Sequence, residues 1–148
     1  MKMLNSVAEL QAKLGQVLIP DAIVAIYLYG SIVREKLRGD SDIDVAMLCS
    51  FEVGGMERIE LISRLEAIFQ TLRREMGLHQ EVSILDLRGK YLSVELQYTV
   101  VTEGVLIYES DEDQRREFEN AARREYFDFA PYLAFLRKRK SEQLLQKA

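Results

Sequence analysis

Apolar residues form short unbroken runs around one polar stretch of the chain. The runs at residues 23–29 (IVAIYLY) and 45–48 (VAML) have the length and composition of buried strands. Residues 81–87 (EVSILDL) predict a further strand. We therefore expect a sheet that holds the polar stretch at residues 30–44 (GSIVREKLRGDSDID), which should begin as a turn with a short helix.

Apolar residues recur at helical spacing in two other segments. In residues 6–18, Ser6 and Glu9 predict a capping box at the start of a helix, and Pro20 follows its end. Residues 56–76 predict a longer helix with Gly77 as its C-cap. The expected buried positions are Val7, Leu10, Leu14, Val17 and Leu18 in the first helix, and Met56, Ile59, Ile62, Leu65, Phe69, Leu72 and Met76 in the second.

A C-terminal helical segment covers about residues 111–140. Acidic residues favour a helix start there, and Pro131 predicts a kink or a division into two helices. The apolar stripe either covers the domain's own core or leaves a part exposed that grips a partner. The basic run at residues 137–140 is either a solvated helix end or a docking surface. The stripe consists of Phe118, Ala122, Tyr126, Phe129, Leu133 and Leu136.

Residues 91–104 fit two kinds of secondary structure. Apolar and polar residues alternate from Leu92 to Val100, as in a strand. Leu92, Leu96 and Val100 also fit one face of a helix, which Gly104 would cap.

The polar stretch ends with two carboxylates at strand spacing. Asp42 and Asp44 would share one face of a strand, while Ile43 and Val45 point into a core on the other face. Two neighbouring carboxylates stay ionised together only when a positive charge lies between them. Hard oxygen ligands favour Mg²⁺, with Mn²⁺ also possible, and Mg²⁺ is usually shared with substrate phosphates. This pair therefore predicts a metal site.

The start of the same stretch offers groups that bind phosphate. Gly30 follows the first strand directly and can adopt backbone angles that are closed to other residues. Ser31 offers a hydroxyl and a backbone N–H where a short helix begins, and such helix starts attract anions. Arg34, Lys36 and Arg38 add positive charge. Together with the carboxylate pair, these groups indicate a nucleoside triphosphate site.

Gly-Ser, ten residues and then Asp-x-Asp resembles the signature of the DNA polymerase β-type nucleotidyltransferase superfamily. The form GS…R…SDIDVAML is similar to its minimal MNT branch, whose members are antitoxins of HEPN-domain toxins. The resemblance runs from about Ile23 to the C-terminal helix. It implies an α+β fold: one minimal domain over residues 1–148, with a small mixed sheet, packed helices and a long C-terminal helix. It also implies a helix for the ambiguous segment and a short strand at residues 105–108.

The resemblance also assigns residues to the site. It implies that Asp42 and Asp44 are catalytic metal ligands, and that ATP binds at Gly30, Ser31, Arg34 and Ser41. The family usually takes a third carboxylate from the next strand, where this chain has Ser83. Glu81 lies two residues earlier on the same strand face, so it is our candidate for the third catalytic and metal-binding carboxylate. Asp86 lies on the opposite face, and a solvated strand end remains the other reading of Glu81.

A calcium loop is the rival interpretation of the acidic residues. Asp40, Asp42 and Asp44 match the opening of an EF-hand. That loop needs Gly at its sixth position and Glu at its twelfth, but Val45 and Phe51 occupy these positions. A solvated acidic turn is the other alternative.

Composition restricts the protein class. A chain of 148 residues suits one domain, and a net charge of −4 argues against direct nucleic-acid binding. Cys49 cannot form an internal disulfide and should be buried, while His79, the only histidine, should lie at the surface. With no signal peptide and no apolar run long enough for a bilayer, we expect a soluble cytoplasmic protein that does not enter the membrane.

Three classes of function remain open. By resemblance, the chain transfers AMP from ATP to a tyrosine of a HEPN RNase toxin and so acts as the antitoxin. Alternatively, it modifies a small molecule, although the chain has little room for the extra domain that such enzymes carry. The third class is an antitoxin that neutralises its toxin by binding alone, which Ser83 keeps open.

Overall fold

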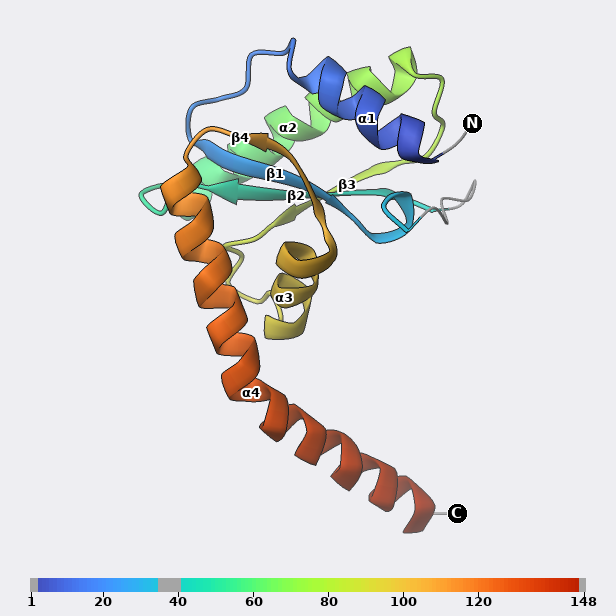
Figure 1. Cartoon of the computed structure of the whole chain (residues 1–148), viewed down its shortest axis with the longest axis vertical. Helices are drawn as coiled ribbons and strands as arrows, with labels where there is room; N and C mark the ends of the chain where they lie inside the picture. The colour runs from blue at the N-terminus through green and yellow to red at the C-terminus, as the bar shows by residue number, and fades with distance from the viewer. Residues whose placement is uncertain (1–2, 35–40, 147–148) are drawn as a thin grey trace.

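A four-stranded sheet lies between two pairs of helices in the computed structural model, which describes residues 3–34 and 41–146 (Figure 1). The strands are β1 (Ile23–Tyr29), β2 (Ile43–Cys49), β3 (Val82–Asp86) and β4 (Val105–Glu109), in the order β3-β2-β1-β4. β1 pairs antiparallel with β2 and β4, and β2 pairs parallel with β3. The fold is therefore α+β with a mixed sheet, as predicted.

Each face of the sheet buries its own core. α1 (Met3–Leu14) and α2 (Gly55–Glu75) cover one face, while α3 (Val94–Glu103) and the first part of α4 (Glu112–Gln146) cover the other (Figure 1). The α1–α2 side receives alternate residues of β2, including Val45 and Met47. The α3–α4 side receives Ala46 and Leu48. β1 and β2 are buried on both faces, which explains why their sequences are continuously apolar.

The predicted strands are confirmed, but the first helix differs from its prediction. α1 begins at Met3, so Ser6 is not an N-cap and is instead buried within the helix. The helix ends at Leu14, directly before Gly15, whose helix propensity is low. Leu18, which we expected to be buried, therefore lies beyond the helix and is 93% exposed.

α2 is rotated slightly from the predicted face. Leu65, Phe69 and Leu72 are buried as expected. Leu61, which was not among the predicted positions, is also buried. Met56 and Ile59, which we expected to be buried, are exposed. The C-terminal cap is confirmed, since Gly77 has a φ of 72°. Gly77 N–H donates to Arg74 O and Leu78 N–H to Arg73 O, which is the Schellman arrangement.

The ambiguous segment is helical, as the family resemblance implied. The Ser93 side chain caps α3 by accepting a hydrogen bond from Leu96 N–H at 3.1 Å. Gly104 ends the helix, although for a different reason from the left-handed conformation of a usual C-cap. Its φ is −71°, and a Cβ there would collide with the carbonyl oxygen of Val100 and crowd that of Leu28. Glycine thus allows the chain to pass closely between α3 and β1.

α4 is one continuous helix with Pro131 inside it, and it bends partway along its length (Figure 1). Its predicted start is confirmed, because Asp111 accepts a hydrogen bond from Gln114 N–H at 3.0 Å. Phe118 and Ala122 of the predicted stripe pack on the sheet, whereas Phe129 and Leu136 are exposed. The stripe therefore covers the core only over the first part of the helix. Among the residues described, no helix is both long and apolar enough to cross a membrane.

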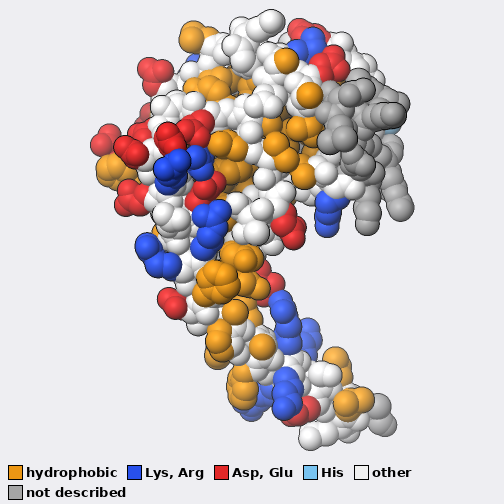
Figure 2. All heavy atoms as spheres, in the orientation of Figure 1, with side chains coloured by type: hydrophobic (Ala, Val, Ile, Leu, Met, Phe, Trp, Pro, Cys, Tyr) orange, Lys and Arg blue, Asp and Glu red, His pale blue; other side chains and the backbone are white. Residues whose placement is uncertain are grey.

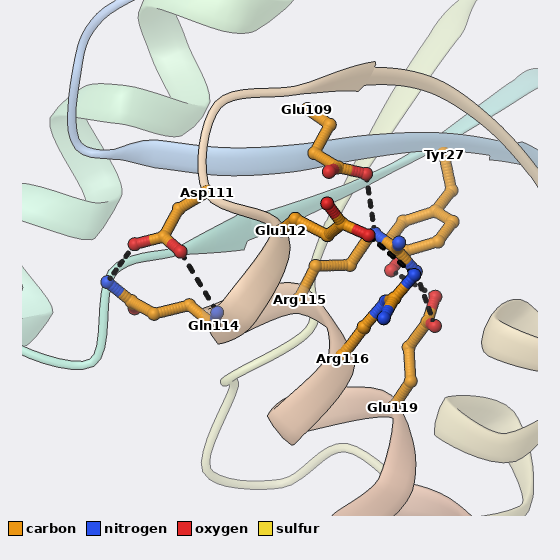
Figure 3. A network of polar contacts seen from close by, with 8 residues as sticks. All are labelled: Tyr27, Glu109, Asp111, Glu112, Gln114, Arg115, Arg116 and Glu119. Carbon is orange, nitrogen blue, oxygen red and sulfur yellow. Dashed lines mark hydrogen bonds and ion pairs between the residues drawn. The ribbon is translucent and has the colours of Figure 1, made fainter.

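A buried polar network fixes α4 to the sheet (Figure 3). The Tyr27 hydroxyl of β1 donates to Glu119 Oε2 at 2.7 Å. Arg115 bridges Glu119 Oε1 at 2.7 Å and Glu109 Oε2 of β4 at 2.6 Å. Burial and the hydrogen bond to Glu119 raise the pKa of Tyr27, so the phenol remains a donor. Because each group is paired, the network orients the start of α4.

We expect Tyr27→Phe to lower the free energy of unfolding by about 1–3 kcal/mol, since it removes the donor to Glu119 Oε2 and leaves only the Arg115 bond at Oε1. Urea denaturation measures this change. Tyr91→Phe is the matched control, because Tyr91 is 93% exposed. Equal stability of the Tyr27 variant and the wild type would show that the network does not hold α4.

Candidate active site

The turn after β1 approaches a carboxylate of β2 very closely. β1 leads directly into a 3₁₀ turn, η1 (Gly30–Ile32), and the N–H groups of Val33 and Arg34 both donate to Gly30 O at 3.2 Å. Gly30 has a φ of 73°, which favours glycine. A Cβ at Gly30 would also overlap the carboxylate of Asp44. Both the backbone angle and the neighbouring carboxylate therefore require glycine here.

Asp44 lies on the predicted face of β2, and Asp42 directly precedes that strand. Ile43 and Val45 are buried against the α1–α2 core, so the alternation of the strand turns Asp44 to the α3–α4 side. Asp44 is half-buried and pairs with Tyr29 across the antiparallel ladder, while Asp42 is exposed. The start of β2 thus presents one sheltered and one open carboxylate beside the Gly30 turn.

The charges of Asp42, Asp44 and Arg34 act on one another. Burial raises the pKa of Asp44, the neighbouring charge of Asp42 raises it further, and Arg34 opposes the shift. Burial and the charge of Asp44 raise the pKa of Tyr29 to about 12. Asp42, Asp44, Tyr29 and Arg34 therefore form one electrostatic cluster in which negative charge is only partly balanced.

A pocket of about 190 Å³ opens at this cluster. Gly30, Arg34 and Asp44 line one part of it, as the sequence suggested. The other part comes from residues that the sequence analysis did not select: Tyr29, Val33, Leu96, Thr99 and Glu103. Leu96, Thr99 and Glu103 are spaced as one face of α3. That spacing is visible in the sequence, but nothing in the sequence places this face opposite Gly30.

Two residues at β3 are candidates for the third ligand, and each lies beside a different aspartate. Ser83 pairs directly with Asp44 in the parallel ladder, so their side chains share a face. Glu81 precedes β3, and its carbonyl accepts a hydrogen bond from Ile43 N–H at 2.7 Å, which places it next to Asp42. Asp86 lies farther along β3, where it pairs with Met47 rather than with Asp44, and its carboxylate bonds Arg58 at 2.9 Å. Within residues 3–34 and 41–146, no three His, Cys, Asp or Glu side chains gather closely enough to hold a metal ion.

The other residues singled out in the sequence are distributed as follows. Ser31 and Ser41 are half-buried at the two ends of the loop between β1 and β2, whereas Lys36, Arg38 and Asp40 lie outside the described residues. The calcium-loop interpretation is wrong, because Val45 is buried in a strand. His79 is exposed, as expected. Cys49 is fully buried, and this burial raises the pKa of its thiol to about 11.

Asp42 and Asp44 have the chemistry that a hard divalent cation needs. Asp44 provides carboxylate oxygens from β2 and Asp42 from the residue directly before it. Burial, and after it the charge of Asp42, raises the pKa of Asp44, and a bound cation would offset both effects. A metal bound to only two protein carboxylates needs further oxygen ligands, which phosphates and water supply. The residues therefore fit a cation that is shared with a phosphate-bearing substrate.

This combination of mixed sheet, glycine turn and paired strand aspartates defines a nucleotidyltransferase domain. The sequence model of the family "Polymerase beta, Nucleotidyltransferase" matches residues 12–113, and the chain belongs to this family. Among curated proteins, none matches the chain in sequence.

Several solved structures share the fold. A crystal structure of the toxin–antitoxin MntA–HepT matches with 25% identity and a TM-score of 0.54, covering 86% of this chain and 94% of the other. A toxin–antitoxin with AMP-PNP matches with 23% identity and a TM-score of 0.59, covering 89% and 96%. A tri-AMPylated Shewanella oneidensis HEPN toxin in complex with MNT antitoxin matches with 24% identity and a TM-score of 0.55, covering 86% of this chain and 93% of the other.

The raised pKa of Asp44 predicts that this carboxylate destabilises the fold at neutral pH. A carboxyl group with a higher pKa in the folded chain binds more protons when folded, so its contribution to the unfolding free energy falls as the pH rises through the raised pKa. We expect Asp44→Asn to be more stable than the wild type at about pH 7 in metal-free buffer, and the gain to vanish below the ordinary carboxyl pKa of about 4.

Urea denaturation across this pH range measures the difference. Asp21→Asn is the control, because Asp21 is exposed and lies outside the cluster. A destabilised Asp44 variant at neutral pH would contradict the unfavourable burial of this charge.

Proposed function

We propose that this protein is a metal-dependent nucleotidyltransferase that moves AMP from ATP to a tyrosine hydroxyl of a HEPN-domain RNase toxin, and so acts as its antitoxin. The observation that carries the proposal is the placement of Asp44, with Asp42 beside it, against the Gly30 turn and near Arg34. Phosphate-binding groups and metal-binding carboxylates thus converge at one end of β1 and β2.

Each residue has a role in this reaction. The Gly30–Ser31 turn binds the β- and γ-phosphates, and Arg34 at the pocket wall adds a positive contact. Ser41, just before β2, offers a further hydroxyl to the nucleotide. Mg²⁺, or Mn²⁺ in its place, held by Asp42 and Asp44 would lower the pKa of the attacking hydroxyl and neutralise charge on the phosphates.

The chemistry is an in-line substitution at the α-phosphorus of ATP. The bond from the acceptor oxygen to the α-phosphorus forms, the bridging bond to the β-phosphate breaks, and pyrophosphate leaves. Because the rigid β1–β2 pair fixes both the turn and the carboxylates, the protein contributes mainly positioning and charge stabilisation.

The related complexes support a protein acceptor. Several solved structures that share this fold are toxin–antitoxin complexes, and in one of them the HEPN toxin is tri-AMPylated. We propose that residues 1–148 work as a single minimal nucleotidyltransferase unit in the cytoplasm, where ATP is available.

Ser83 favours a second candidate function. The residue that pairs with Asp44 on β3 is a neutral hydroxyl, which is a weaker ligand for a divalent cation than a carboxylate. An antitoxin with an impaired metal site would neutralise its toxin by binding alone.

We expect Asp42→Asn and Asp44→Asn each to reduce AMP transfer on the order of a hundredfold or more, because each removes a charge that holds the metal. The assay incubates α-labelled ATP and Mg²⁺ with this protein and the product of the neighbouring gene, which this proposal predicts to be a HEPN-domain protein. Asp21→Asn is the control variant, and circular dichroism checks folding. Label on the neighbour supports the proposal; label only on a small acceptor, or a stable complex without label, contradicts it.

Substitutions on β3 test the third carboxylate. If Glu81 completes the site, Glu81→Gln should lower transfer roughly tenfold and weaken Mn²⁺ binding, whereas Ser83→Asp should strengthen Mn²⁺ binding beside Asp44. Electron paramagnetic resonance of Mn²⁺ measures affinity, and the labelling assay measures transfer. Unchanged metal affinity and transfer in Glu81→Gln would remove Glu81 from the site and leave it as a solvated strand end.

A further inference from the structure

The last part of α4 carries aromatic side chains that the rest of the chain does not cover. We call residues 127–146 the arm. Ala122 is the last buried residue of α4, and beyond it the helix continues away from the sheet (Figure 1). Figure 2 shows hydrophobic side chains gathered along the arm, with basic side chains next to them. Its exposed large hydrophobic residues are Phe127, Phe129, Tyr132, Phe135, Leu136, Leu144 and Leu145.

This surface is unusual for a helix that only completes a domain. Tyr132 and Phe135 are each 56% exposed, although aromatic residues of this size normally bury most of their area. Contiguous exposed apolar surface of this kind marks protein-binding sites. The match to the nucleotidyltransferase family ends at residue 113, so the arm is not part of the region that defines the family.

The arm is attached to the helix that forms a wall of the active-site pocket. Tyr98 of α3 stacks on Tyr126 of α4, with ring centroids 3.8 Å apart and an interplanar angle of 11°. Arg137 of the arm bonds both carboxylate oxygens of Glu95 of α3 at 2.7 Å. The next turns of α3 place Leu96, Thr99 and Glu103 at the pocket. One short helix thus connects the arm to the pocket.

The arm also runs towards the side of the molecule on which the pocket lies. Beyond the bend in α4, the arm passes below α3 towards the side of the molecule that carries η1 (Figure 1). A polypeptide bound to the arm would therefore lie beside α3, near the opening that contains Asp44.

Charge selects the kind of partner. The arm has four basic and two acidic side chains, and Arg137, Lys138, Arg139 and Lys140 are consecutive. Four consecutive helical positions point around most of the helix circumference, so any partner packed there meets positive charge. Pairing two arms in parallel would place like charges together. An acidic surface on a different protein fits better than a second arm.

We propose that the arm is the docking surface for the polypeptide that accepts the nucleotide. The partner's contact face has an apolar centre that receives Tyr132 and Phe135, with an acidic rim that meets residues 137–140. This inference rests on the proposed function for the identity of the acceptor. It adds how the acceptor is recognised and held near the pocket.

Paired variants of the full-length protein test the two components of this surface. The double variant Tyr132→Ser with Phe135→Ser removes apolar contacts, and Lys138→Glu with Lys140→Glu reverses charge. The matched control is Leu18→Ser with Met56→Ser, because Leu18 and Met56 are 93% and 81% exposed outside the arm. Calorimetry measures affinity for the product of the neighbouring gene, which the proposed function predicts to be a HEPN-domain protein, without ATP. Separate titrations measure ATP affinity, and light scattering measures oligomeric state.

We expect both arm variants to bind the HEPN protein at least about tenfold more weakly, with ATP affinity unchanged and the control variant normal. The charge-reversal effect should shrink as salt rises, because it is electrostatic. Arm variants that bind the partner normally would overturn the proposal. So would variants that change only self-association, which would assign the arm to a second copy, or a wild type that does not bind the HEPN protein.

The outcomes separate docking from chemistry. Wild-type protein that binds the HEPN protein but transfers no label contradicts the proposed function, while the affinities of the arm variants still decide the docking surface. Transfer that is equally fast in wild type and arm variants at low partner concentration contradicts the docking surface and leaves the proposed function intact.

Discussion

The contact between the Asp44 carboxylate and the bare Cα of Gly30 is the constraint on which the site depends. It requires a glycine with positive φ at the end of β1 and an inward-facing aspartate on β2. The antiparallel pairing of Tyr29 with Asp44 fixes the register that brings the two together. A slip of one residue in β2 would turn its carboxylates to the other face and its apolar residues out of the core. Core packing and site geometry are therefore set by the same register.

The sequence predicted this part of the molecule well because the signals agree there. β1 was expected at residues 23–29 and has those bounds, and the alternation of Ile43 and Val45 with the aspartates was correct. Prediction failed where a local signal competed with packing. Ser6 and Glu9 form a plausible capping box, yet the helix begins earlier and buries Ser6. The α3 wall of the pocket could not be predicted, because its approach to Gly30 depends on the tight passage at Gly104.

The aspartates at β2 and the candidate ligand at β3 differ in how well the sequence alone places them. Asp42 and Asp44 follow from one strand and one alternation, so a single sequence is sufficient to place them. The candidates for a third ligand depend on β3, whose parallel pairing puts Ser83 beside Asp44 and Glu81 at the edge near Asp42. The sequence indicated both residues but not their neighbours. Similarly, the helical stripe of α4 predicted a helix without showing that only its first part would reach the core.

The burial of Cys49 determines how its thiol reacts with alkylating and oxidising reagents. It is the only cysteine of the chain and lies fully enclosed at the end of β2, with a thiol that resists ionisation. Since alkylating and oxidising reagents attack the exposed thiolate, they reach this sulfur only when the sheet opens. The rate at which the sulfur reacts therefore reports the opening of β2, the strand that carries Asp44 and directly follows Asp42. The reaction rate of the Cys49 thiol is thus a built-in probe of local unfolding at the centre of the sheet.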